Sequence, residues 1–463
     1  MKDLGKKSPT QEVYVNNRDI EWRKKKLEEK RRELESGQLN ALRELLPNDV
    51  ILKICEECQY YFRNRLLSPL VIIFHMMSAA VSREGSFQSA WHLSGQSRQS
   101  GSLAKARKRL PLEVWIQLDK WMKGQIETES GDQDRWRGHR MIGVDGTCIS
   151  MSDEPELAKR FGKRWGRYGF SRFPLGRMLV AFNLKTLISV GHEVDGYTTS
   201  ELELLGRCLP KLQRGDVLVG DRRYAGVKLY LQYQQAGLEY ITRTHHRLQV
   251  ERLKTIERFT SKDFLVELPM NPESLRRDPS LPKFVRIRVI KTTAKIRGKE
   301  ETFWLVTSLL DPQQYPATEI QGWYKTRWRV ETLIEELKVW LNSDVLRSKT
   351  AEGVEKELFA RLIALNLIHW LILKAAKQSQ KEPDRLSVSA TLRLAVSYSL
   401  KMSAAPVWQL RSLYEELLHH VGNSDVPYRP DRIEPRMQKR EQKRYSKLKI
   451  PRSEWKRLYA MAA

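Results

Sequence analysis

Short apolar runs between residues 141 and 244 constrain the fold of this chain more than any other feature of its sequence. They are MIGVD (141–145), RMLVAFNLKT (177–186), LISVGHEV (187–194), DVLVGD (216–221) and YITRT (240–244). Segments with helical spacing of apolar residues, 200–209 and 227–237, lie between them. Strands mixed with helices in this way predict a mixed α/β sheet.

The pattern changes between Arg243 and Pro316, where FLVEL, FVRIRVIKTT and TFWLVTSLL are β-like and little helix is expected. We predict a β-rich insertion at about residues 243–316, within an α/β domain that covers residues 131–378. The polar, turn-rich segment from Glu129 to Arg140 marks the start of this domain.

Helical patterns precede the domain, and residues 1–130 are predicted to form a helical N-terminal DNA-binding region. The apolar stretch of residues 66–81 reads as a buried helix, and residues 86–110 suit a loose helix-turn-helix. The second helix of that motif would present four cations to DNA: Lys105, Arg107, Lys108 and Arg109. The charge-dense segment of residues 17–46 is either a solvated helix or a basic arm on DNA.

Residues 379–463 are predicted to form a helical C-terminal region that ends in a basic tail. Nine basic and three acidic residues lie between Arg429 and Lys449, a composition suited to phosphates.

The net charge of +26, from 82 Lys and Arg against 56 Asp and Glu, implies a polyanionic partner, and nucleic acid is the default candidate. A membrane is disfavoured, because the best apolar stretch contains Ser, Pro and His and falls short of about 18 unbroken apolar residues. The N-terminus lacks the apolar core of a signal peptide, and four Cys in 463 residues do not form a disulfide framework. We therefore expect a cytoplasmic, DNA-associated protein.

The segment YKTRWRVETLIEELKVW (324–340) reads as an amphipathic helix with an exposed-looking Tyr and a charged edge. At about 100° of rotation per residue, Tyr324, Arg327, Glu331 and Lys338 fall within an arc of roughly 60°. The bland interpretation is a solvated face, on which Arg327 and Glu331 form an i,i+4 pair worth about 0.3–0.5 kcal/mol. The alternative is an edge that faces an anion, and spacing alone favours the bland interpretation.

Two apolar runs that end in aspartate change that balance. MIGVD and DVLVGD place Asp145 and Asp221 on strands or at strand ends, although each signal is weak alone because Asp often begins a loop. With Glu331 on a later helix, three carboxylates can converge on divalent metal. Mg²⁺ and Mn²⁺ take hard oxygen ligands, and two such ions can clamp the attacking and leaving oxygens of a phosphoryl displacement. The other charged and aromatic residues of the helix edge would then contact phosphates or a base.

The spacing Tyr324-x2-Arg327-x3-Glu331-x6-Lys338 resembles the Y-R-E-K signature of bacterial insertion-sequence DDE transposases of the insertion-sequence-four family. IGVDGT and LVGDRRYAG are similar to the family's first and second Asp segments, with Arg-Tyr after Asp221 in place of the commoner Arg-Gly-Tyr/Phe. SLAKARKRLP, LRSKTAEGVEKELFARLIALNLI and RIEPRMQKREQKRY are also similar to family sequence. The resemblance covers residues 85–449.

This resemblance implies a ribonuclease H-like catalytic core that the β-rich insertion interrupts. It implies three catalytic residues that are also the ligands of Mg²⁺, for which Mn²⁺ can substitute: Asp145, Asp221 and Glu331. It implies three DNA-binding residues beside them: Tyr324, Arg327 and Lys338. It further implies a homodimer on paired transposon ends, which acts on terminal inverted repeats and target DNA by cut-and-paste transposition, commonly through a hairpin intermediate.

Other residues are candidates for DNA contact. The segment RFGKRWGRYGFSR (160–172) has five basic and no acidic residues, with interleaved aromatics suited to phosphates and unpaired bases; a mobile basic loop is the plain alternative. Its candidate contacts are Lys163, Arg164, Trp165 and Arg167. Trp304 and Trp323 could hold a flipped base, although Trp is more often a core residue.

Two other functions fit the same bulk properties. A non-catalytic DNA-binding relative of transposases, such as a repressor, would use the basic surface but gives no reason for three carboxylates to converge. A nuclease on the ribonuclease H-like fold would cut random DNA and terminal-repeat DNA alike.

Overall fold

The computed structural model describes residues 40–63, 66–82, 86–93, 100–166, 169–171, 173–245, 248–296 and 299–427, with isolated positions outside these ranges. The chain divides into a large unit, residues 1–293 and 302–426, and a small unit, residues 294–301 and 427–463. The basic tail and most of the charge-dense segment of residues 17–46 lie outside the described residues.

Helices precede the sheet in the chain. They are α2 (Asn48–Glu57), α3 (Pro69–Val81), α4 (Phe87–Leu93), α5 (Ser100–Arg109) and α6 (Leu112–Ser130). Every residue of α3 is buried, as the apolar stretch predicted, and the Ser68 hydroxyl caps this helix by accepting from the Val71 N–H at 3.4 Å. Helices α4 and α5 fall within the predicted helix-turn-helix, but its turn, residues 94–99, lies outside the described residues.

A nine-stranded sheet has the order β5-β4-β1-β6-β7-β11-β10-β9-β8. Its first five strands match the five apolar runs: β1 (Met141–Ser150), β4 (Leu175–Asn183), β5 (Ser189–Gly196), β6 (Val217–Gly220) and β7 (Glu239–Arg243). Strand β1 is antiparallel to β4 and parallel to β6, and β6 is parallel to β7. The predicted mixed α/β sheet is therefore confirmed.

The β-rich segment contains β8 (Lys254–Thr260), β9 (Asp263–Pro269), α10 (Pro272–Arg277), β10 (Phe284–Ile296) and β11 (Lys299–Thr307). Strand β11 pairs antiparallel with β7, so the insertion extends the main sheet and shares its hydrogen-bond ladder. The Arg288 side chain is fully buried in the insertion and donates to Asp263 at 2.8 and 2.6 Å.

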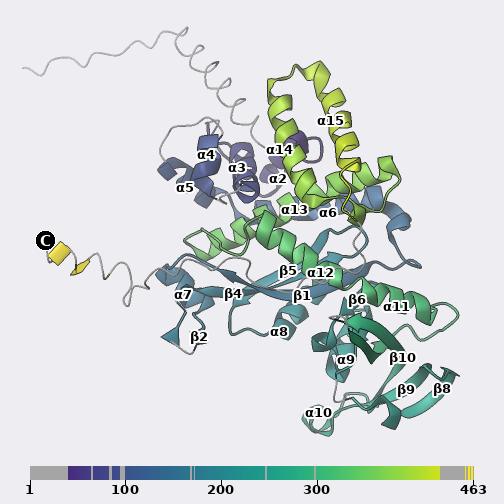
Figure 1. Ribbon diagram of the computed structural model, residues 1–463. Coiled ribbons are helices and arrows are strands. Elements are labelled where there is room, and N and C mark those ends of the chain that lie inside the picture. Colours follow the sequence, from purple (N-terminus) through teal and green to yellow (C-terminus); the bar gives the residue numbers. More distant parts are fainter. Residues whose placement is uncertain are drawn as a thin grey trace, which may run out of the picture. The chain divides into compact units, whose positions relative to one another are not determined.

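Helices cover both faces of the sheet, with α12 and α13 on one face and α8 and α9 on the other (Figure 1). The helices after β1 are α7 (Pro155–Phe161), α8 (Glu201–Cys208), α9 (Val227–Gln235), α11 (Ala317–Lys325), α12 (Trp328–Glu335), α13 (Ala351–Ser379), α14 (Val388–Ala404) and α15 (Val407–Gly422). Among the described residues, α13 alone is long and apolar enough to cross a membrane, and 83% of its most apolar window is buried inside the protein, as in a core helix.

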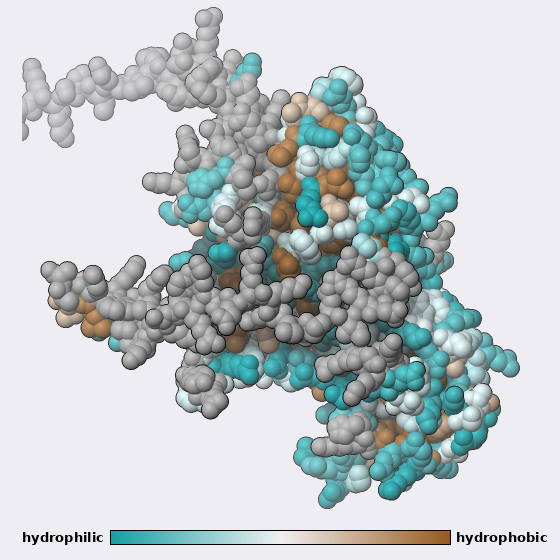
Figure 2. Space-filling view, viewed as in Figure 1, coloured by the Kyte–Doolittle hydropathy of each residue, from teal (hydrophilic) through white to brown (hydrophobic). Residues whose placement is uncertain are grey.

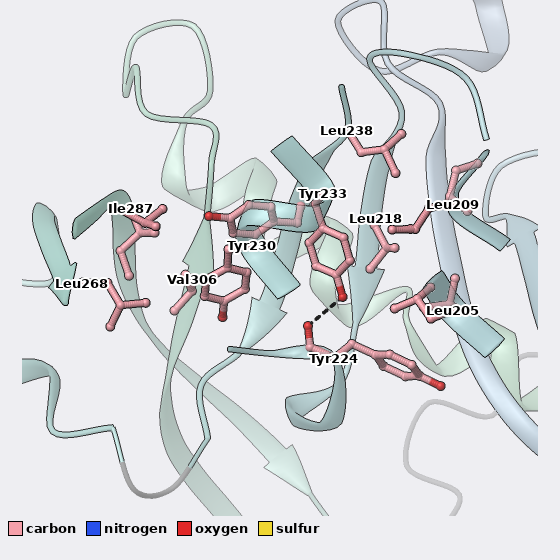
Figure 3. Packing of buried hydrophobic residues seen from close by; sticks show 14 of the residues in the cluster. Leu205, Leu209, Leu218, Tyr224, Tyr230, Tyr233, Leu238, Leu268, Ile287 and Val306 are labelled. Carbon is pink, nitrogen blue, oxygen red and sulfur yellow. Dashed lines mark hydrogen bonds between the residues drawn. The ribbon is translucent and has the colours of Figure 1, made fainter. Parts of the chain in front are cut away.

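Stacked tyrosines fill the core between the sheet and α8–α9 (Figure 3). The rings of Tyr230 and Tyr240 stack at 4.4 Å between centroids, and the Tyr233 hydroxyl donates to the Tyr224 carbonyl oxygen at 3.0 Å. This bond fixes the chain directly after β6, where the second predicted catalytic aspartate lies.

Hydrophobic side chains reach the surface over α14 and α15 (Figure 2). Leu400 near the end of α14 is 59% exposed, and Val407 and Trp408 at the start of α15 are 84% and 77% exposed. Exposed apolar groups that gather in this way are typical of a protein interaction site.

Candidate active site

The two aspartates lie near each other because β1 and β6 are adjacent and parallel: Asp145 is in β1, and Asp221 directly follows the end of β6. Gly143 of β1 pairs with Val219 of β6, and each aspartate follows two residues later. One carboxylate oxygen of Asp145 accepts from the Gly146 N–H at 2.8 Å, and one of Asp221 accepts from the Arg223 N–H at 2.7 Å. The parallel register thus brings together two residues that are far apart in the sequence.

Burial raises the pKa of Asp145 to about 6, and the negative charges of Asp221 and Glu331 act in the same direction. The Gly146 N–H and the Arg327 guanidinium lower this pKa in part. The three predicted catalytic carboxylates and Arg327 therefore share one electrostatic neighbourhood.

A glycine lets α12 approach the sheet closely enough to bring Glu331 to the aspartates. A Cβ atom added to Gly143 would lie 2.3 Å from Cγ2 of Val330 and 2.7 Å from Cδ2 of Leu184. Arg329 holds the same helix to the turn after β4, since its guanidinium donates to the Leu184 carbonyl oxygen at 2.8 Å. Glu331 follows Val330 directly, so this contact determines its position.

Arg327 and Glu331 form the expected i,i+4 pair, with Nη2 and Oε1 at 3.2 Å. The bland interpretation of a solvated face is wrong for Arg327, because its side chain is only 11% exposed, against 28% for Glu331. A buried guanidinium beside three carboxylates supplies charge compensation within the site.

Tyr324 is buried, in contrast to its exposed appearance in the sequence. It is 9% exposed, and its ring lies 5.8 Å from that of Phe303 in β11. Burial raises its pKa to about 12, which keeps the hydroxyl protonated and able to donate at neutral pH. Arg327 contacts it and Asp221 lies near it, so this residue also belongs to the site.

The segment of residues 324–340 is not one regular helix. α11 ends at Lys325, α12 begins at Trp328, and a π-helical turn, η6 (Glu336–Trp340), follows. At the junction, the Arg327 and Val330 N–H groups donate to carbonyls three residues earlier. The π turn carries Lys338, whose Nζ donates to Thr147 Oγ1 at 3.3 Å and to the Cys148 carbonyl oxygen at 3.4 Å. The Lys338 side chain therefore packs against β1, close to Asp145 in the chain.

The carboxylates supply the oxygen ligands that Mg²⁺ and Mn²⁺ prefer, and their mutual repulsion at Asp145 is the kind that a cation relieves. Within the described part of the chain, however, no three His, Cys, Asp or Glu side chains lie close enough together to hold a metal ion as they stand. The Glu331 carboxylate contacts Arg327 instead. The donor set fits a divalent cation, and its binding would bring these carboxylates closer together than they stand here.

Two functional candidates escaped the sequence reasoning. Glu201, the first residue of α8, lies over Gly146, and Tyr224 lies in the 3₁₀ turn η4 (Arg222–Tyr224) directly after Asp221. The sequence signal that could have indicated Glu201 was Gly146, because a glycine next to a candidate catalytic residue allows the close approach of another side chain.

Within the basic segment of residues 160–172, the described residues include a short antiparallel hairpin, with Trp165 of β2 (Trp165–Gly166) opposite Phe170 of β3 (Gly169–Phe170), and the DNA contacts predicted for this segment stay a prediction. Trp165 is 69% exposed. Lys163 pairs with Asp153 at 2.7 Å, and the Arg164 guanidinium lies 5.5 Å from the ring centroid of Tyr197. Arg167 lies outside the described residues.

The four cations of α5 differ in their surroundings. Lys105, Lys108 and Arg109 are exposed. Arg107 is half-buried, with its guanidinium 3.6 Å from the ring centroid of Phe87, and burial lowers its pKa to about 10. Arg107 therefore joins α5 to α4, while the other three are available to a ligand.

The two tryptophans proposed for a flipped base make packing contacts. The Trp304 indole N–H donates to Glu251 at 3.1 Å, and its ring meets Phe264 edge-on at 5.3 Å. Trp323 lies 6.1 Å from Trp136 between ring centroids. These contacts agree with the plain interpretation, in which both are structural.

Comparisons with known proteins agree with this geometry. The family described as "Transposase DDE domain" matches residues 136–367, which is half of the chain and includes all three carboxylates. Residues 136–367 of this chain are therefore a DDE transposase domain.

Two curated relatives specify the group further. "Transposase InsG for insertion sequence element IS4" of Escherichia coli (strain K12) is 24% identical over 344 residues, which cover 73% of this chain and 76% of that protein. "Probable transposase for insertion sequence element IS5377" of Geobacillus stearothermophilus is 23% identical over 211 residues, which cover 44% of this chain and 53% of that protein. The chain belongs to the insertion-sequence DDE transposases of the IS4 family.

Proposed function

We propose that the chain is a metal-dependent polynucleotidyl transferase that cuts DNA strands at the ends of an insertion sequence and joins them to target DNA by cut-and-paste transposition. The observation that carries this proposal is the nearness of Asp145 in β1, Asp221 directly after β6, and Glu331 in α12. We propose these three as catalytic residues on a ribonuclease H-like core.

Asp145, Asp221 and Glu331 would hold Mg²⁺ or Mn²⁺, which when bound would neutralise phosphate charge and activate the attacking oxygen. Arg327 is already buried and oriented by Glu331, so it can grip a phosphate oxygen without a large loss of side-chain freedom. The protonated Tyr324 hydroxyl can donate to a neighbouring phosphate oxygen.

Lys338 suits a phosphate contact for a different reason. Its bonds to Thr147 and to the Cys148 carbonyl oxygen are long, at 3.3 and 3.4 Å, and both acceptors are uncharged. A phosphate would give the ammonium group a shorter, charge-assisted bond at the same position on β1.

A basic and aromatic groove in the N-terminal helices supports DNA binding there. Tyr60, Tyr61, Phe62 and Trp91 line a cavity of about 780 Å³ together with three cations, Arg63, Lys105 and Arg109. The described residues that line it include no carboxylate, and such a surface suits phosphates beside stacked bases. We assign DNA contacts to residues 1–130 on this basis, and to the exposed Trp165 hairpin of the catalytic domain, residues 131–378.

A homodimer on paired ends also belongs to the proposal. The exposed apolar side chains of α14 and α15 support it, because they offer residues 379–463 a surface for a second copy. Cleavage through a hairpin intermediate follows from the family resemblance.

Strand cleavage in Mg²⁺ tests the proposal, with DNA that carries the terminal repeats of the parent element. Glu331→Gln should lower the cleavage rate at least about 100-fold while leaving DNA binding intact, because it removes a ligand and keeps the side-chain shape. Glu335→Gln is the matched control, one turn along α12 and exposed to solvent. Hairpin ends would migrate as a distinct product on denaturing gels.

Three results would oppose the proposal in different ways. Normal cleavage by Glu331→Gln would remove this residue from catalysis. Equal cleavage of random DNA would indicate a nuclease. Specific binding without any cleavage by the unaltered protein would indicate a non-catalytic relative.

A further inference from the structure

A fourth carboxylate, that of Glu201 in α8, lies against β1 at the residue that follows Asp145, on the face of the sheet opposite α12. A Cβ atom added to Gly146, the residue after Asp145, would lie 2.4 Å from Cδ and 2.9 Å from Oε1 of Glu201. The Glu201 side chain is only 13% exposed, although it stands at the start of a helix. The absence of a side chain at Gly146 thus leaves space for the Glu201 carboxylate. Exposure to solvent does not account for an acidic residue there, because the side chain is mostly buried.

Glu201 is also tied to the second aspartate. Its Oε2 pairs with Nη1 of Arg223 at 3.0 Å, and the backbone N–H of Arg223 donates to Asp221 at 2.7 Å. Glu201 therefore lies against the residue after Asp145 and pairs with Arg223, whose backbone N–H is capped by Asp221. Glu201 thus links β1 to the turn that follows β6.

The hydroxyl of Tyr224 supplies an independent observation. Tyr224 is 1% exposed, and its hydroxyl has no hydrogen-bond partner in the part of the chain that the structure describes. Burial raises its pKa well above the usual value, the nearby charges of Asp145, Glu201 and Asp221 raise it further, and Arg223 lowers it. In Figure 3 the ring extends away from the tyrosine cluster, while the Tyr233 hydroxyl holds the Tyr224 backbone.

An unsatisfied buried hydroxyl costs about 1–3 kcal/mol, whereas phenylalanine would fill the same space without that cost. A buried, unpartnered tyrosine hydroxyl near Asp145, Glu201 and Asp221 is therefore better explained as a donor to one of these carboxylates when they rearrange.

We propose that Glu201 and Tyr224 are positioning residues of the strand-cleaving site. Glu201 holds Arg223 and the turn after Asp221, and the Tyr224 hydroxyl donates to a carboxylate when the aspartates take up a divalent cation. This inference rests on the proposed function, because it assumes that Asp145 and Asp221 bind metal. A purely structural ion pair between Glu201 and Arg223 is the competing explanation.

Binding of Mn²⁺ alone to the full chain separates these explanations, measured by calorimetry and by loss of the electron paramagnetic resonance signal of free Mn²⁺. Glu201→Gln and Tyr224→Phe keep side-chain shape. Groups that orient metal ligands typically contribute about 10–100-fold in affinity, so each variant should bind Mn²⁺ at least about tenfold more weakly. The Mg²⁺ concentration for half-maximal cleavage should rise by a similar factor.

Glu203→Gln is the matched control, because Glu203 lies in the same helix and pairs with Arg207 on the surface. The urea midpoint of each variant without metal shows whether folding has changed. Weaker Mn²⁺ binding with an unchanged midpoint supports the proposal.

The positioning role is overturned if the variants bind Mn²⁺ as tightly as the unaltered protein. It is also overturned if every variant that binds Mn²⁺ more weakly has a correspondingly lower urea midpoint. If the unaltered protein neither binds Mn²⁺ nor cuts DNA, the proposed function fails as well. If it does both and the variants match it, only the positioning role fails.

Discussion

Replacing Asp145 with Asn should stabilise the metal-free protein at neutral pH, although it removes a predicted metal ligand. Burial raises the pKa of Asp145 from 3.8 to about 6. The folded state therefore binds this proton more tightly than the unfolded state. Stability from this group is fully present below pH 3.8 and is lost as the pH rises through about 6.

The size of the effect follows from the same shift. A rise from 3.8 to about 6 is about 2.2 pKa units, which corresponds to about 3 kcal/mol at 1.36 kcal/mol per unit. The carboxyl is not fully buried, so solvent screening reduces the expected gain to about 1–2 kcal/mol. Asn keeps an oxygen that can accept from the Gly146 N–H, now at 2.8 Å. The substitution thus removes the charge and retains the local bond.

Urea unfolding of both proteins between pH 4 and pH 8 in EDTA, followed by tryptophan fluorescence, measures this difference. The variant should be more stable at pH 7.5, and the gap should close near pH 4. Asp132→Asn is the control, because that side chain is fully exposed. Added Mg²⁺ should stabilise the unaltered protein and not the variant. Equal stability at every pH, or a variant that is weaker at pH 7.5, would refute the electrostatic reasoning.

Two further substitutions test the packing that supports the site. Gly143→Ala should displace α12, because the added Cβ would lie 2.3 Å from Val330. We expect the cleavage rate to fall at least about tenfold and the free energy of urea unfolding to fall by about 1–3 kcal/mol. Gly206→Ala is the control and should change neither quantity, because no atom lies within 4 Å of its added Cβ. Arg288→Ala should lower the unfolding free energy by about 3–5 kcal/mol, since it leaves the Asp263 carboxylate buried without its partner, and the double variant with Asp263→Ala should recover part of that loss in the same assay.

Much of the sheet was predictable because its central strands are buried on both faces. Runs such as those before Asp145 and Asp221 are continuously apolar for that reason, and both end where the chain reaches the polar edge. The residue types of the candidate site could be identified by the same logic, since a carboxylate that follows a buried strand stands out against its neighbours.

The helix edge was less predictable, because its geometry depends on tertiary contacts. A fixed rotation of about 100° per residue cannot represent the tight turn at Arg327 or the π turn that carries Lys338. Tyr324 is buried by Phe303, a residue of the insertion whose position no local pattern reveals. Glu201 was missed because only the close approach of α8 to Gly146 brings it to the site.

The path of the chain explains how an insertion of this size leaves the site intact. Strand β11 returns antiparallel to β7, so the chain leaves and re-enters the sheet at neighbouring positions. The region where α11 begins is then fixed to the segment before β1: Tyr315 bonds His139 at 2.8 Å, and Glu319 pairs with Arg137 at 2.6 Å. From this anchor α11 leads to α12, which Gly143 admits onto β1. The position of Glu331 therefore depends on the ends of the insertion and not on its length, so the strands between them can vary without displacing the third carboxylate.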